Sequence, residues 1–190
     1  MKKIVMRKTA KYDPLIPGFS RYGSYDLITR QKYQPGIVRE DKMAEGIYDG
    51  IFASDMRRGV ETAGLYKIAK PVVLLADLRE VKFSLRDLLT EEEYDSGGSN
   101  LVRQRFAERF MDDRLSENRR SIRERILALL KRLTRLQGGT YLGISHSFFM
   151  KILDIYVKDG DLFKHPTLLA KYFNTQKKTY NFQEGFEFEL

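Results

Sequence analysis

Positively charged and titratable side chains occur at the ends of several short apolar runs in this sequence. Arg7 and Lys8 end one such run, Arg58 and Glu80 come soon after two others, and His146 follows a fourth. An arginine guanidinium pairs in a bidentate manner with the oxygens of a phosphoryl group. A carboxylic acid such as Glu80 can protonate a leaving alkoxide when its pKa is tuned. These residue types therefore predict a site for the phosphoryl group of a phosphate ester.

The apolar runs have the length and composition of β-strands. We expect strands over residues 2–6, 48–53, 72–76 and 140–144. The third run is continuously apolar, as in a strand buried on both faces. Helices are expected from Ser54, as N-cap, to about residue 69, and over residues 147–157. This alternation predicts an α/β fold, a three-layer α/β/α sandwich with a mostly parallel sheet.

Ligands of such sheets bind beyond the carboxyl ends of the strands. The residues that follow the four strands, with Arg57 beside Arg58, are therefore expected to converge on one edge of the sheet.

The segments between these elements have other patterns. Residues 12–38 are punctuated by prolines and glycines at turn spacing, and residues 40–47 predict a short helix. Residues 91–94 predict a helical turn, residues 96–100 a flexible loop, and residues 101–111 a helix.

Two further patterns lie in the second half of the chain. Apolar residues recur every three or four positions from Ser116, an expected N-cap, to about residue 136, which predicts a long helix. The tail alternates polar and apolar residues over 179–183 and 185–190, and this alternation predicts a terminal hairpin.

The order and spacing of these residues resemble the histidine phosphatase superfamily, which is phosphoglycerate-mutase-like. Ala53-Ser-Asp-Met-Arg-Arg-Gly-Val-Glu-Thr-Ala63 is similar to the family pattern Ser-Ser-Asp-Leu-x-Arg-Ala-x-Gln-Thr-Ala. Ile144-Ser-His-Ser147 is similar to its Val-Ser-His-Gly, and Leu78-Arg-Glu80 to the Leu-x-Glu that carries its acid. Glu117 followed by Arg125-Ile126 resembles its Glu-Ser…Arg-Val. The resemblance covers essentially the whole chain.

The resemblance implies a phosphoglycerate-mutase-like fold and a role for each residue. It implies that Arg7 and Arg58 bind the phosphoryl group, that Glu80 is the acid and base, and that His146 stabilises the transferring phosphoryl group. It also implies a nucleophilic histidine in an Arg-His-Gly triplet after the first strand. This chain has Arg7-Lys8-Thr9 there, so a lysine stands at the position of the nucleophile.

A lysine is a nitrogen nucleophile only after it has lost its proton. From an unperturbed pKa of about 10.4, neutrality at pH 7 needs a drop of roughly 3.4, or about 4.6 kcal/mol. Cationic neighbours favour such a drop, but an arriving phosphate dianion stabilises the ammonium form. Lys8 is therefore better suited to bind an anion than to attack it.

We therefore expect residues 1–190 to form one domain that binds phosphate or a phosphorylated small molecule, with little or no turnover. Its phosphate-binding residues are Arg7, Lys8, Arg58 and His146, and its candidate catalytic residues are Lys8, Glu80 and His146. Residues 12–38 and 82–114 are expected to cap the site and to select the substrate.

Two other functions remain open from the sequence. One is an active phosphatase or phosphotransferase that uses Lys8 or His146 as its nucleophile. The other is a basic interaction protein that binds an acidic protein or nucleic acid through residues 116–136, where arginines and lysines outnumber acids.

Composition excludes several classes of site. The chain of 190 residues has no cysteine, so disulfides, thiolate nucleophiles and cysteine metal sites are excluded. Its two histidines argue against a histidine-built metal site, and no cofactor is expected. The net charge is +8, which suits an acidic ligand or partner. We expect neither a transmembrane helix nor a signal peptide, and we expect the protein in the cytosol.

Overall fold

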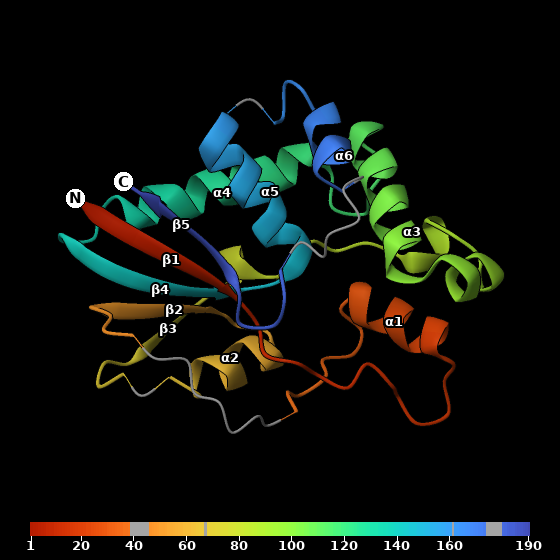
Figure 1. Cartoon of the computed structure of the whole chain (residues 1–190), viewed down its shortest axis with the longest axis horizontal. Coiled ribbons are helices and arrows are strands. Elements are labelled where there is room, and N and C mark those ends of the chain that lie inside the picture. The colour runs from red at the N-terminus through yellow and green to blue at the C-terminus, as the bar shows by residue number, and fades with distance from the viewer. Residues whose placement is uncertain (39–45, 67, 161, 174–179) are drawn as a thin grey trace.

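A sheet lies at the centre of the computed structural model, which describes residues 1–38, 46–66, 68–160, 162–173 and 180–190 (Figure 1). The described residues form five strands: β1 Lys2–Lys8, β2 Gly50–Ser54, β3 Val72–Leu75, β4 Gly139–Ser145 and β5 Gly185–Glu189. Their spatial order is β3-β2-β4-β1-β5. β5 runs antiparallel to β1, and the other neighbours are parallel. The predicted α/β fold with a mostly parallel sheet is confirmed.

Helices cover both faces of the sheet (Figure 1). The helix α2 (Arg57–Ala63) lies on one face, and α4 (Arg119–Leu133) and α5 (Ser147–Asp159) lie on the other. The remaining helices are α1 Arg21–Thr29, α3 Glu91–Met111 and α6 Thr167–Phe173, with short 3-10 helices η1 Ala76–Leu78 and η2 Leu85–Asp87. Figure 1 shows α1 and α3 beyond the carboxyl ends of the parallel strands, where they bound the region that a ligand would enter.

The side chains of β1 alternate between two hydrophobic cores, one on each face of the sheet. Ile4 and Met6 pack into the larger core under α4 and α5, whereas Val5 packs into the smaller one under α2. Successive side chains of a strand point to opposite faces, so both helical layers gain buried apolar surface. Full burial of an aliphatic side chain of this size contributes about 1.5–3 kcal/mol.

The strand β3 lies at the edge of the sheet, and the prediction that both of its faces are buried was wrong. Val72, Val73 and Leu74 are 37%, 45% and 48% exposed. A continuous apolar run does not reveal where a strand lies in the sheet, because strand order is set by pairing with distant segments. Here β3 pairs only with β2 within the described part of the chain.

Two predicted helix starts were also wrong. The helix α2 begins at Arg57 after Met56, because Ser54 still belongs to β2 and its Oγ accepts a hydrogen bond from the Met56 backbone N–H at 3.3 Å. The helix α4 begins after Asn118, whose side chain accepts a hydrogen bond from Ser121 N at 2.9 Å, and not at Ser116. At α4 the nearer Asn118 caps the first turn, whereas Met56 at the start of α2 makes no side-chain cap hydrogen bond.

The flexible loop predicted for residues 96–100 is absent, because α3 continues through this segment. The helix bends at Gly98, whose φ of 53° and ψ of −148° lie outside the helical region. Glycine adopts this conformation without the strain that a Cβ would add. At the start of α3, Thr90 and Glu93 form a reciprocal capping box.

The predicted terminal hairpin was wrong, because β5 pairs with β1 instead of with the preceding residues. Residues 180–183 are not in a strand, and Thr179 lies outside the described residues. The helix predicted for residues 40–47 lies largely outside them as well, and residues 46 and 47 are not helical. No helix in the described ranges has both the length and the apolar character needed to cross a membrane.

Gly59 lets α2 lie directly against the end of β2. A Cβ on Gly59 would lie 2.5 Å from the Ser54 carbonyl oxygen, which belongs to the backbone and cannot rotate away. We expect Gly59→Ala to lower the free energy of unfolding by about 1–3 kcal/mol, measured by denaturant titration.

Gly64 at the end of the same helix provides the matched control. Its φ is −66°, and the nearest atom to an added Cβ is 3.4 Å away. Gly64→Ala is expected to change stability by less than about 1 kcal/mol. Equal losses in the two variants would contradict the close packing of α2 on β2.

Candidate functional site

A cavity of about 440 Å³ opens at the carboxyl ends of the parallel strands. The structure brings Lys8, Arg58, Glu80 and His146 to its wall. Lys8 is the last residue of β1, Arg58 lies in the first turn of α2, Glu80 follows η1, and His146 lies between β4 and α5. The predicted convergence on one edge therefore holds for these four residues, which come from distant parts of the chain.

Backbone pairing places Lys8 and His146 side by side. The parallel register puts Lys8 opposite Ser145, the residue before His146. The Thr9 N–H donates to the Ser145 carbonyl at 2.9 Å, so the pairing continues past the end of β1. The Ser145 hydroxyl donates to the Leu78 carbonyl at 2.7 Å, which holds the segment leading to Glu80 against β4.

Two further contacts hold the start of α2 in place. The Thr62 hydroxyl accepts a hydrogen bond from Ala10 N at 2.9 Å and donates to the Arg58 carbonyl at 2.6 Å. Arg79 pairs with both carboxylate oxygens of Asp55 at 2.6 Å, so the residue before Glu80 is tied to the turn before α2. The hydrogen bonds from Arg79 lower the pKa of Asp55, which keeps this pair charged.

Arg58 and His146 form a buried pair at the inner end of the cavity. Arg58 is 4% exposed and His146 is 1% exposed, and the Arg58 Nε–H donates to His146 Nδ1 at 3.0 Å. Burial, together with the positive charges of Arg58, Arg125 and Lys8, lowers the pKa of His146 well below its ordinary value. His146 is therefore neutral at pH 7, and because its Nδ1 accepts the hydrogen bond from Arg58, its single N–H is on Nε2.

This pair leaves two buried donors without a partner among the described residues. They are His146 Nε2 and Arg58 Nη1. An unsatisfied buried N–H group costs about 1–3 kcal/mol, so a structure retains such groups where a ligand satisfies them. Both residues line the cavity, and an oxyanion is the ligand that accepts from two N–H donors.

Glu80 is bound to the start of α5. Its Oε1 accepts hydrogen bonds from Phe149 N at 2.9 Å and Val81 N at 3.0 Å, and its Oε2 accepts from Phe148 N at 3.3 Å. Burial raises the pKa of Glu80, while these backbone donors and Arg58 oppose the rise. The raised pKa is the direction that an acid near neutral pH needs, but the carboxylate also satisfies the first turn of α5.

Two contacts of the Lys8 side chain favour an ammonium ion. Its Nζ donates to the Tyr180 carbonyl at 3.2 Å and lies 4.5 Å from the centre of the Phe182 ring. A carbonyl oxygen accepts one of the ammonium protons, and an aromatic face attracts the positive charge. The segment from Tyr180 to Glu184 is itself attached to β1, because the Lys8 N–H donates to the Glu184 carbonyl at 2.8 Å.

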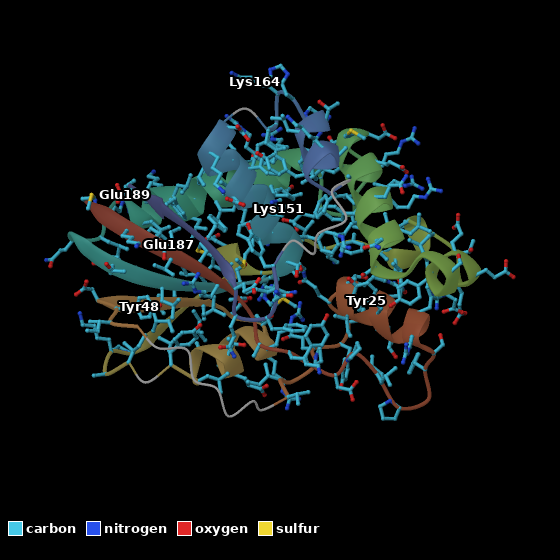
Figure 2. All side chains as sticks on the ribbon, in the orientation of Figure 1. Tyr25, Tyr48, Lys151, Lys164, Glu187 and Glu189 are labelled. Carbon is cyan, nitrogen blue, oxygen red and sulfur yellow. The ribbon has the colours of Figure 1, made fainter. Side chains whose placement is uncertain are left out.

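The structure does not bring Arg7 to the cavity. Lys8 and Arg7 are successive residues of β1, so their side chains leave opposite faces of the sheet. Arg7 Nη2 lies 3.9 Å from Glu187 Oε1. Glu187, labelled in Figure 2, belongs to β5. Arg57 is also absent from the cavity wall, because its side chain is exposed and pairs with Glu61 at 2.8 Å.

Sequence reasoning missed most of the residues that line the cavity, among them Tyr12, Arg103, Tyr180 and Phe182. Tyr12 lies with its ring centre 5.2 Å from the Arg58 guanidinium carbon, and Tyr180, Phe182 and Arg103 complete other parts of the wall. Tyr180 and Phe182 were interpreted as part of a strand, because their alternation is also a strand pattern. Arg103 belongs to α3, within the segment expected to cap the site. The sequence pattern of this helix does not indicate that the Arg103 side chain faces the cavity.

Comparison with known proteins gives a family and a fold. The model of the histidine phosphatase superfamily (branch 1) matches residues 40–175, a range that contains Arg58, Glu80 and His146 but begins after Lys8. No curated protein matches the sequence.

Two solved structures from Entamoeba histolytica resemble the chain. Phosphoserine phosphatase in complex with 3-phosphoglyceric acid has a TM-score of 0.54 at 16% identity, covering 90% of this chain and 85% of that chain. A histidine-to-alanine mutant of phosphoserine phosphatase, in complex with phosphoserine, has a TM-score of 0.51 at 16% identity with the same coverage. At this identity the similarity shows the fold alone.

The lowered pKa of His146 predicts a pH-dependent stability. As the pH falls below the ordinary histidine value of 6.5, the unfolded chain takes up a proton that the native state does not bind. Stability therefore falls by up to about 1.4 kcal/mol per pH unit. Denaturant unfolding between pH 7.5 and 5.5 measures this slope, and His146→Gln is expected to reduce it.

The second histidine of the chain, the exposed His165, provides the control. His165→Gln is expected to leave the slope as it is in the wild type. A slope that disappears with His165 and persists without His146 would contradict the buried, neutral state of His146.

Proposed function

Because the chain belongs to the histidine phosphatase superfamily, we propose that it binds the phosphoryl group of a phosphomonoester and hydrolyses it very slowly or not at all. The observation that carries this proposal is the environment of Lys8. The side chain lies beside Arg58 and His146 at the cavity wall, where contacts to Tyr180 and Phe182 hold it as an ammonium ion.

The binding part of the proposal rests on the charges and donors at the inner end of the cavity. Lys8 and Arg58 supply positive charge, and the His146 Nε2–H and Arg58 Nη1 supply buried donors. Hydrogen bonds between ionised partners are about twice as strong as neutral ones. Glu80 is the only acidic residue among the described lining residues, and backbone N–H groups bind both of its oxygens. A phosphate dianion therefore meets little repulsion.

The low turnover follows from the protonation state of Lys8. An amine attacks phosphorus through a lone pair, and an ammonium ion has none. The Tyr180 carbonyl and the Phe182 ring both stabilise the ammonium, and a bound dianion stabilises it further. Histidine at the same position would carry a lone pair at neutral pH, because its ordinary pKa is about 6.5.

His146 is poorly suited to replace the missing nucleophile. Its Nδ1 lone pair accepts the hydrogen bond from Arg58, and its Nε2 therefore carries the proton. Attack through Nε2 would first require loss of that proton from a neutral imidazole. The geometry supports His146 as a donor to the phosphoryl oxygens.

The alternative of an acidic macromolecular partner has less support. On α4, Arg120 pairs with Glu124 at 2.8 Å, and Arg125 pairs with Glu117 at 3.1 Å. Arg132 lies 3.7 Å from Asp77. These acids of the chain itself offset part of the helix charge, so the cavity is the better candidate for the ligand site.

Binding of an inorganic oxyanion tests the proposal directly. Phosphate and vanadate are expected to raise the melting temperature of the wild type in a concentration-dependent manner. Lys8→Gln removes a charge-assisted hydrogen bond, worth about 1.5–3 kcal/mol, so the phosphate affinity is expected to fall roughly 10- to 150-fold.

Lys3→Gln is the matched control, because Lys3 lies on the same strand and pairs with Glu187 at 2.7 Å. It is expected to bind phosphate as the wild type does. No stabilisation by either oxyanion, at any concentration tried, would favour the basic interaction protein instead.

Turnover tests the second half of the proposal. The wild type is expected to release no 4-nitrophenol from 4-nitrophenyl phosphate above the rate of a Lys8→Asn control. Lys8→His places a group with a lone pair beside the bound phosphate and is expected to create measurable hydrolysis. Hydrolysis by the wild type that Lys8→Ala abolishes would show that Lys8 is a nucleophile and that the proposal is wrong.

A further inference from the structure

The cavity is much larger than a phosphate ion needs. Its volume of about 440 Å³ lies in the range of pockets that enclose a whole small ligand, about 300–1,000 Å³. A phosphoryl group fills only part of this volume, so most of the cavity surrounds whatever is esterified to the phosphate. The residues of the remaining wall therefore indicate which kind of group is esterified to the phosphate.

Aromatic rings adjoin the cationic groups themselves. The ring centre of Tyr12 lies 5.2 Å from the guanidinium carbon of Arg58, and that of Phe182 lies 4.5 Å from Lys8 Nζ. Both rings line the cavity. When a phosphoryl group binds beside Arg58 and Lys8, the atoms next to its ester oxygen therefore contact aromatic rings.

The wall continues with rings from several elements. Tyr25 on α1 (Figure 2) and Tyr94 on α3 have their ring centres 6.0 Å apart, and Phe83 packs edge-on against Phe148 at 5.2 Å. All four line the cavity. Burial raises the pKa values of Tyr12, Tyr25 and Tyr94, so their hydroxyls stay neutral and do not repel an anion.

The described part of the wall offers little negative charge to pair with a substrate ammonium group. Glu80 is its only carboxylate, and both Glu80 oxygens accept backbone hydrogen bonds. Lys11 and Arg103 add further positive charge to the lining. An amino-acid phosphate with a free ammonium group would therefore bring that group among cations, whereas a neutral ring finds aromatic partners.

We infer that the ligand is an aryl phosphate monoester, with an aromatic ring bonded directly to the phosphate oxygen. This inference rests on the proposed function and adds the chemical class of the esterified group. The ring lies among Tyr12, Phe182 and the rings beyond them, while the phosphate meets Lys8, Arg58 and His146. The same chemistry occurs in small aryl phosphates and in a phosphorylated tyrosine of a polypeptide.

Calorimetry with three ligands of similar charge tests the inference. They are inorganic phosphate, phenyl phosphate and cyclohexyl phosphate, of which the last keeps the size of the ring but lacks its π face. Two ring contacts are expected to make phenyl phosphate bind at least about 5-fold more tightly than cyclohexyl phosphate. Equal affinities of the two esters, with inorganic phosphate still bound, would overturn the inference and leave the proposed function standing.

A lack of binding by all three ligands would instead overturn the proposed function, and the inference with it. The two failures are thus distinguishable in one set of titrations.

Variants of the wall give a second readout. Tyr12→Leu and Phe182→Leu are each expected to bring the ratio of the phenyl and cyclohexyl affinities toward one. Phe182 is 39% exposed, so its replacement does not remove a core residue. Phe19→Leu is the matched control, because Phe19 is 53% exposed, lies outside the cavity wall and should leave the ratio unchanged. A ratio that both wall variants retain would overturn the inference.

A phosphotyrosine peptide identifies the source of the ring. Tighter binding of the peptide than of phenyl phosphate would support a polypeptide ligand, because residues beyond the ring then add contacts. Tighter binding of phenyl phosphate would support a small aryl phosphate.

Discussion

The hydrogen bond from Arg58 Nε to His146 Nδ1 is the interaction on which the site depends. It joins the first turn of α2 to the end of β4 across 88 positions of sequence. The same hydrogen bond sets the tautomer of His146, whose proton lies on Nε2. It also holds the guanidinium of Arg58 at the cavity wall. The contacts of Thr62, Ser145 and Asp55 hold the backbone segments that make this bond.

The C-terminal segment that begins at Tyr180 contacts both α5 and the end of β1. The Tyr180 hydroxyl donates to Asp154 Oδ2 of α5 at 2.5 Å, and the Tyr180 carbonyl accepts from Lys8. One residue therefore connects α5 to the charged end of β1. The Phe182 ring of the same segment lies 4.5 Å from Lys8 Nζ, so two groups of the segment contact this amine.

Glu80 shows how burial and hydrogen bonding act in opposite directions on one carboxylate. Its carboxylate accepts from the first N–H groups of α5, a role that any buried helix start needs. The same burial raises its pKa, as expected for an acid. The backbone donors and Arg58 act in the opposite direction, and burial has the larger effect on the pKa of Glu80.

The sequence by itself predicted the alternation of strands and helices, the parallel sheet, and a set of residues at its carboxyl edge that included Arg7 and Arg57 as well as the four found there. These follow from local periodicity and from the rule that parallel strands end on the same side. Only the tertiary structure decided that β3 lies at an edge, that Arg7 faces away from the cavity, and that Tyr180 reaches Lys8. That last contact spans 172 positions. No local pattern encodes it, because a residue's propensity describes its own backbone and not the distant partner that its carbonyl will meet.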